Sequence, residues 1–171
     1  QVIYLGDDDA AEQIAHDARA RIDSEGVRTL EERAAELALG GSAGDIERMV
    51  DADVELERLS ALRTVPRSPS RAIEMLDDRI VLMVFDKTLL DEDDIANATV
   101  IVYGKSKEML VKRFGQRAFF TPGPLSHDRV GILEHEEDGR LALSVFDTVG
   151  TPILRESPSS MCRAAPALST I

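Results

Sequence analysis

The hydrophobic positions along the chain change their spacing near its middle. Between residues 10 and 64 apolar side chains recur at helical spacing, which is typical of amphipathic helices. From residue 73 onward they form short runs separated by turn residues, which is the pattern of β-strands. Pro66-Arg-Ser-Pro-Ser70 separates the two regions. The chain is therefore expected to be helix-rich first and strand-rich second.

The first region is predicted to begin with a strand and a helix. The apolar run Val2–Leu5 is typical of a buried strand. The acidic residues 7–9 that follow suit the start of a helix, because its free N–H groups and its dipole favour negative charge. Apolar residues at helical spacing then predict an amphipathic helix over residues 10–23, which ends at Ser24-Glu-Gly26.

Two capped helices are predicted next. Thr29 and Glu32 form a capping box that begins a helix, and this helix ends at Gly40-Gly41. Ser42 caps a third helix, whose charged outer face is typical of a solvated surface. The apolar residues of this third helix are expected to point mostly inward: Ile46, Met49, Val50, Val54, Leu56, Leu59 and Leu62.

Strands dominate the second region. A hairpin is predicted around Asp77-Asp78-Arg79, and a short acidic helix at about residues 89–96 leads into the next strand. The predicted strands cover residues 73–76, 80–85, 99–103, 109–114, 117–121, 130–135 and 141–146, with a last short one after Gly150. Residues 157–171, rich in Ser, Pro and Ala, are expected to be a loose tail.

Composition narrows the classes of function. The net charge of −12 argues against a surface for nucleic acid or anionic membranes, since both select clustered Lys and Arg. A single cysteine, Cys162, cannot form an internal disulfide, so a reducing, cytoplasmic environment is expected. No apolar run approaches the roughly 20 residues that a membrane span needs.

Two predicted strands deliver loops with charged or turn-forming residues. The strand that ends at Tyr103 continues into Gly104-Lys-Ser-Lys107. The strand that begins at Arg117 continues into Thr121-Pro-Gly-Pro-Leu-Ser126. Because α/β folds place their chemistry in loops at the carboxyl ends of strands, these two loops are the candidate site.

The order of these strands and loops resembles the calcineurin-like metallophosphoesterases, in particular the small bacterial and archaeal phosphodiesterases and the related retromer subunit. In that family one strand ends in a His-Gly loop, a later one in Gly-His-x-His, and a two-strand hairpin in Asn-Pro-Gly-Ser. Here Ile80–Phe85, Val100–Gly104 and Met109–Gly123 fall in that order, and Gly6-Asp7 matches the family's Gly-Asp. The resemblance is best over residues 73–150.

The resemblance implies a fold as well as a site. It predicts an α/β fold, a metallophosphoesterase-like layered α/β-sheet domain with a helical N-terminal half and a strand-rich C-terminal half. One such domain is expected over residues 1–156. Residues 27–64 form a remodelled helical segment where the family carries metal ligands.

The site departs from the family at its metal ligands. Family members bind two divalent metals, such as Mn or Zn, which clamp a phosphate and turn bound water into a nucleophile. Here Asp86 stands near the position of a lone His, and Lys105 and Lys107 stand at the two His positions of Gly-His-x-His. A protonated lysine has no lone pair for a metal, and a buried neutral one needs a large fall in pKa. We therefore expect no metal cofactor.

We interpret the two lysines as replacing the metals, with their ammonium groups neutralising the inherited carboxylates. The candidate binding residues are Asp7, Asp8, Asp86, Gly104, Lys105, Lys107, Ser126 and His127. No catalytic residue and no metal ligand is assigned.

The leading hypothesis is a pseudoenzyme, a catalytically degenerate metallophosphoesterase-fold protein that serves as an interaction, scaffolding or sensing module with a protein partner. This resembles the retromer-subunit relative, which uses its fold to bind proteins. One alternative is an active metal-dependent phosphodiesterase or phosphatase, with two metals held by unusual ligands or by an upstream segment. Another is a metal-free binder of a small anion through Lys105 and Lys107.

Overall fold

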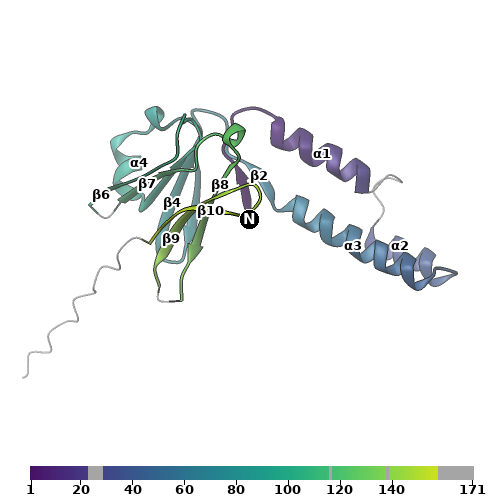
Figure 1. Ribbon diagram of the computed structural model, residues 1–171. Coiled ribbons are helices and arrows are strands. Elements are labelled where there is room, and N and C mark those ends of the chain that lie inside the picture. Colours follow the sequence, from purple (N-terminus) through teal and green to yellow (C-terminus); the bar gives the residue numbers. More distant parts are fainter. Residues whose placement is uncertain (23–28, 116, 138, 158–171) are drawn as a thin grey trace, which may run out of the picture. The chain divides into compact units, whose positions relative to one another are not determined.

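A computed structural model of the chain describes residues 1–22, 29–115, 117–137 and 139–157 (Figure 1). The chain divides into two compact units, Gln1–Arg71 and Ala72–Ile171. The expectation of one domain over residues 1–156 stays a prediction. The predicted helix end at residues 24–26 and residues 158–171 of the predicted tail lie outside the described residues. The chain is a mixed α/β protein, helix-rich first and strand-rich second, as the hydrophobic pattern predicts.

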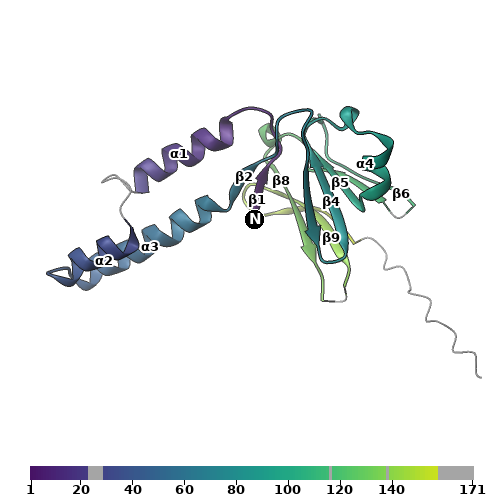
Figure 2. The same ribbon diagram turned by 180° about the vertical axis from the view of Figure 1, so that it is seen from behind.

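The first unit combines a small sheet with three helices. Its elements are β1 (Val2–Tyr4), α1 (Ala10–Ile22), α2 (Leu30–Ala38), α3 (Ala43–Ser60) and β2 (Leu62–Thr64). Strands β1 and β2 pair in parallel, with Val2 opposite Leu62. The prediction missed β2, because its residues continue the helical spacing of α3. Helix α3 contacts both α1 and α2, and α2 lies alongside one end of α3 in both views (Figures 1 and 2).

Two predictions about burial in this unit are wrong. Val2, predicted to lie in a buried strand, is 57% exposed, because β1 belongs to a sheet of only two strands. Ile46, Val50 and Val54, predicted to point mostly inward from α3, are exposed. The inner face of α3 is instead the one that carries Met49, and it is only half-buried.

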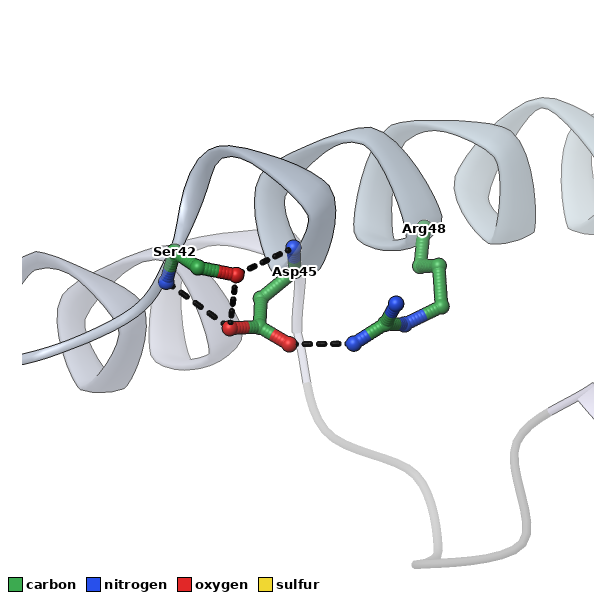
Figure 3. A network of polar contacts seen from close by, with 3 residues as sticks. All are labelled: Ser42, Asp45 and Arg48. Atoms are coloured by element: carbon green, nitrogen blue, oxygen red, sulfur yellow. Dashed lines mark hydrogen bonds and ion pairs between the residues drawn. The ribbon is translucent and has the colours of Figure 1, made fainter.

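The predicted capping box at Thr29 and the predicted N-cap at Ser42 are confirmed, and Ser42 forms a capping box as well. Thr29 Oγ1 accepts a hydrogen bond from the backbone N–H of Glu32 at 3.2 Å, and the Glu32 carboxylate accepts from the N–H of Thr29 at 2.9 Å. At the start of α3, Ser42 Oγ accepts from Asp45 N at 3.3 Å, and Asp45 Oδ2 accepts from Ser42 N at 2.8 Å (Figure 3). Each box satisfies N–H groups that the first turn of a helix leaves unpaired.

The Asp45 carboxylate joins the cap to an ion pair on the same turn. It accepts from the Ser42 hydroxyl at 2.7 Å and pairs with the Arg48 guanidinium (Figure 3). The hydrogen bond from the Ser42 hydroxyl is the main reason that the pKa of Asp45 lies below its ordinary value.

We expect Ser42→Ala to destabilise α3 by about 1 kcal/mol, because one N–H of the first turn loses its acceptor. Urea unfolding followed by circular dichroism at 222 nm measures the loss. Ser60→Ala is the matched control. The Ser60 hydroxyl donates to the carbonyl of Glu57 at the other end of α3, so it caps no N–H group. Equal losses in the two variants would contradict the role assigned to Ser42.

The second unit contains a five-stranded sheet in the order β3-β4-β5-β7-β6. Its strands are β3 (Ala72–Leu76), β4 (Arg79–Val84), β5 (Val100–Tyr103), β6 (Leu110–Phe114) and β7 (Arg117–Thr121). Strands β4, β5 and β7 are parallel, whereas β3 pairs antiparallel with β4 and β6 antiparallel with β7. The predicted hairpin is confirmed, and Asp77 in its turn has a φ of 54°.

A three-stranded antiparallel sheet follows, in the order β10-β9-β8. Its strands are β8 (Arg129–His135), β9 (Leu141–Asp147) and β10 (Pro152–Glu156). Residues 141–145 of the central strand β9 are all buried. These strands correspond to the predicted strands at residues 130–135 and 141–146 and to the last short one after Gly150, and they lie together in Figure 1.

Strands β4 and β5 of the five-stranded sheet contain consecutive buried residues, so both faces of this sheet are covered. Leu82, Ile101 and Ala98 form a buried cluster, and Ile95 of α4 (Glu92–Asn97) packs on it. Gly131 of β8 lies so close to Phe120 of β7 that an added Cβ would stand 2.8 Å from the ring. The missing side chain at position 131 therefore lets the two sheets approach each other at this point.

Candidate functional site

The candidate site forms where β4, β5 and β7 end. Parallel strands bring their carboxyl ends to one edge of the sheet, so the loops after them are neighbours. Val84 pairs with Tyr103 at the end of the β4–β5 ladder. Two further backbone bonds extend it, from Gly104 N to the Val84 carbonyl at 3.1 Å and from Lys105 N to the Phe85 carbonyl at 2.8 Å. These bonds bring residues 85–88 alongside residues 104–107.

An ion pair joins the two loops. Lys105 Nζ lies 2.5 Å from Asp86 Oδ2. The Asp86 side chain is only 14% exposed, whereas that of Lys105 is 62% exposed. The structure therefore brings together two of the predicted binding residues, Asp86 and Lys105, and the Lys105 side chain remains exposed to solvent.

Asp86 is held by more than the lysine. It is the N-cap of a short 3-10 helix, η1 (Lys87–Leu89), and its Oδ1 accepts from Thr88 N at 3.0 Å and from Thr88 Oγ1 at 2.8 Å. The hydrogen bond from Lys105, with these two bonds from Thr88, lowers the pKa of Asp86 to about 2. The carboxylate is therefore fully ionised near neutral pH, and both of its oxygens accept hydrogen bonds.

A second lysine lies at the same edge. Lys87 Nζ lies 3.3 Å from the hydroxyl of Tyr103 and 4.3 Å from the centroid of its ring. Tyr103 is buried at the end of β5, so its ring presents a fixed face to the ammonium. The sequence prediction missed both residues, because a lone Lys beside Asp86 and a Tyr that ends an apolar run carry no motif.

The loop after β7 comes close to the loop after β5. Gly123 has a φ of 88°, and a Cβ at that position would stand 3.0 Å from the backbone N of Met109. Its N–H donates to Thr121 Oγ1 at 3.3 Å. Glycine is therefore favoured here by its conformation and by the close approach of two backbones.

The remaining predicted site residues are placed as follows. Gly104 is half-buried between β5 and Lys105, and Lys107 is exposed. Ser126 and His127 are exposed in a second 3-10 helix, η2 (Leu125–His127). Among the described residues, the side chains of Ser126, His127 and Lys107 make no hydrogen bond, and the structure does not join them to the ion pair.

Asp7 and Asp8 belong to the other compact unit. Asp7 is exposed, and Asp8 Oδ1 accepts from the backbone N–H of Ala10 at the start of α1, at 3.1 Å. The pKa of Tyr4 lies above its ordinary value, first because of burial and next because of the neighbouring Asp8 carboxylate. Their participation in a site with Asp86 stays a prediction.

The groups around Asp86 do not fit a divalent metal. Both carboxylate oxygens accept hydrogen bonds, and the group closest to Oδ2 is an ammonium, which has no lone pair and repels a cation. No group of three or more His, Cys, Asp or Glu side chains gathers as metal ligands within the described residues. The described part of the chain also contains no helix long and apolar enough to cross a membrane.

Comparisons of sequence and of structure give different results. No protein-family model matches the chain, and no curated protein matches it in sequence. Solved structures do match. One is a predicted phosphoesterase from Streptococcus pneumoniae, at 15% identity over 57% of this chain and 70% of that one, with a TM-score of 0.45.

Vps29 proteins match in the same way. Vps29 from Entamoeba histolytica complexed with Zn²⁺ is 13% identical over 62% of this chain and 75% of that one, with a TM-score of 0.45. Vacuolar Protein Sorting 29 from Cryptosporidium parvum is 11% identical over 57% and 63%, with a TM-score of 0.33. The chain is thus similar to a predicted phosphoesterase and to Vps29 proteins over about 60% of its length, with TM-scores below 0.5.

Proposed function

We propose that this chain is a metallophosphoesterase-like protein that has lost its catalytic metals and serves as an interaction, scaffolding or sensing module for a protein partner. The observation that supports the proposal is the ion pair between Lys105 Nζ and Asp86 Oδ2. It puts a permanent positive charge beside the carboxylate at the edge of the sheet where the family resemblance places metal ligands. The Lys105 ammonium therefore neutralises the Asp86 carboxylate without a metal ion.

The proposal explains the chemistry of the edge better than a metal site does. An Asp with a pKa of about 2 is a good metal ligand by itself, but its charge here is already matched by the lysine. Lysine binds its partner as a point charge with three donors, and its ammonium both competes with a divalent cation for Asp86 Oδ2 and repels it. On this proposal the loops at the strand ends keep the place of the site, and the pair of Lys105 and Asp86 replaces the metals there.

The test is the metal content of the purified chain, together with hydrolysis of bis(p-nitrophenyl) phosphate in added Mn²⁺. We expect far less than one bound metal per chain and no Mn²⁺-dependent turnover. About two metals per chain with turnover would overturn the proposal and favour an active phosphodiesterase with unusual ligands.

A pair of designed variants sharpens this test. The double substitution Lys105→His and Lys107→His replaces both ammonium groups by metal ligands and is expected to increase Mn²⁺ binding over that of the unmodified chain. Adding Asp86→Asn to this variant removes the carboxylate and should reverse the gain. If the unmodified chain binds Mn²⁺ as tightly as the His variant does, the lysine does not exclude the metal.

A second candidate function is supported by Lys107. This side chain is exposed and makes no hydrogen bond or ion pair among the described residues, and it lies two positions from Lys105. A small anion such as phosphate could bind to such ammonium groups as point charges. Calorimetric titration of inorganic phosphate into the chain and into Lys107→Met tests this. Binding that is absent, or that is equal in the two proteins, would remove this candidate.

A further inference from the structure

Helix α3 exposes a continuous apolar stripe. Ile46, Val50 and Val54, here called the α3 stripe, are 48%, 49% and 41% exposed. Residues four apart lie one above another on a helix, so the three side chains line one face over two turns. Amphipathic helices in globular proteins normally bury such a face against the rest of the fold.

The stripe is not the face that α3 uses inside its own unit. The helix contacts α1 and α2 with the neighbouring side, on which Met49, Leu56 and Leu59 are half-buried. Asp53, at the border between the two sides, has its Oδ1 3.4 Å from Arg33 Nη2 of α2. No described residue of α2 or α3 is buried, so these helices gain little from burial within the unit. The described residues of this unit therefore leave the stripe uncovered.

Carboxylates border the stripe along one side. Glu47, Asp51 and Glu55 each follow a stripe residue by one position, which places them in a parallel row on the helix surface. Glu55 pairs with Arg58 at 2.7 Å. Among the described residues, the carboxylates of Glu47 and Asp51 have no ion-pair partner. The row leaves negative charge beside apolar surface.

We infer that the α3 stripe docks an amphipathic helix of a partner protein, whose apolar residues recur every three or four positions and whose Lys or Arg side chains run along one side. The apolar residues of the partner helix would cover the stripe, and its Lys or Arg side chains would pair with Glu47 and Asp51. A second copy of this chain fits poorly, because it brings another row of carboxylates and a net charge of −12. An anionic membrane is repelled for the same reason.

This inference uses only residues of the unit Gln1–Arg71 and is independent of the proposed loss of metals at Asp86. Metal binding and turnover would overturn that proposal without affecting this one. Failure of the experiment below would leave the ion pair and its interpretation unchanged.

The experiment measures the binding of two synthetic helical peptides to the full chain by fluorescence anisotropy at physiological salt. Both peptides carry Leu at positions three or four apart. One has Lys along the side of the Leu row, and the other has Glu at the same positions. We expect the chain to bind the Lys peptide and to bind the Glu peptide much more weakly.

Two substitutions test the apolar part of the contact. Ile46→Ser with Val50→Ser should weaken the binding of the Lys peptide about tenfold or more, because central apolar residues dominate such contacts. Ile14→Ser with Leu39→Ser is the matched control in the same unit, where both side chains are exposed outside the stripe. The control should bind as the unmodified chain does.

Two further substitutions test the charged part. Glu47→Lys with Asp51→Lys should reverse the preference, so that the Glu peptide binds more tightly than the Lys peptide. Asp78→Lys with Glu137→Lys changes the net charge equally at exposed positions of the other unit and should leave the preference unchanged. This comparison separates local pairing from the overall acidity of the chain.

Three results would overturn the inference. One is equal weakening by the stripe variant and by its control. Another is a reversal of preference by the distant charge variant, which would show that net charge alone attracts the peptide. The third is reversible dimerisation in sedimentation velocity that Ile46→Ser with Val50→Ser abolishes, which would make a second copy the occupant.

Discussion

Phe120→Ala is expected to destabilise the strand-rich unit by about 3–5 kcal/mol, the cost typical of removing a buried aromatic ring. Phe120 is 1% exposed and contacts Gly131 on β8. Removing the ring leaves a cavity between β7 and β8 that the sheets cannot close without losing their pairing. Phe114→Ala on the exposed side of β6 is the matched control and should cost much less.

The contact of Phe120 with Gly131 makes the prediction sharper. Gly131→Ala places a methyl group 2.8 Å from the Phe120 ring and 3.2 Å from Pro122, so it should also destabilise the unit, by about 1–3 kcal/mol. Phe120→Leu makes the side chain smaller. The double variant, with Phe120→Leu and Gly131→Ala, should therefore lose less stability than the sum of the losses in the two single variants. Urea unfolding of the four proteins measures this coupling, and simple additivity would show that the two residues do not share the space.

Lys105→Met is expected to raise the pKa of Asp86 from about 2 toward the ordinary value of an aspartate, because the hydrogen bond from Lys105 is the largest cause of the lowered pKa. Part of the lowering should remain, since Thr88 still donates two hydrogen bonds. Carbon-13 NMR of the side-chain carboxyl during an acid titration measures the shift. Thr88→Val, which removes only the hydroxyl donor, should produce a smaller rise.

The same pair predicts how stability depends on pH. The pKa of Asp86 in the folded chain, about 2, lies below that of an unfolded aspartate, roughly 3.9. The pair therefore contributes stability that is fully present above about pH 4 and is lost as the pH falls toward 2. Lys105→Met should flatten the loss of stability in this window. An unchanged acid-unfolding profile would contradict the importance of the pair.

Much of the candidate site follows from the order of residues along the chain. The runs that end at Phe85 and Tyr103 predict two strands, and adjacent parallel strands place Asp86 and Lys105 at one edge. Their direct ion pair depends on the register, in which Val84 lies opposite Tyr103, and no local pattern encodes that register. The contact of Lys87 with Tyr103 was missed for the same reason.

The helical unit shows where sequence patterns mislead. Apolar spacing predicts correctly that α3 is a helix, yet it cannot say which of its apolar residues have something to pack against. Met49 and Val50 are neighbours in the same pattern, but Met49 is half-buried toward the other helices and Val50 is exposed. The sequence pattern did not predict strand β2. This strand consists of three residues that follow α3, and it forms only because they pair with β1, about 60 positions earlier in the chain.

By itself the sequence determined what depends on neighbouring residues: the capping box at Thr29, the N-cap at Ser42, the hairpin at Asp77, the apolar runs of the strands and the acidic charge of the whole chain. These features arise from backbone geometry and side-chain chemistry within a few positions. Only the tertiary structure decided that Lys105 lies on Asp86, that Phe120 occupies the space beside Gly131, and that the α3 stripe is exposed. Each of these features depends on which segments far apart in the sequence come into contact. Such contacts determine which side chains are buried and which charges pair, and local spacing along the chain does not encode them.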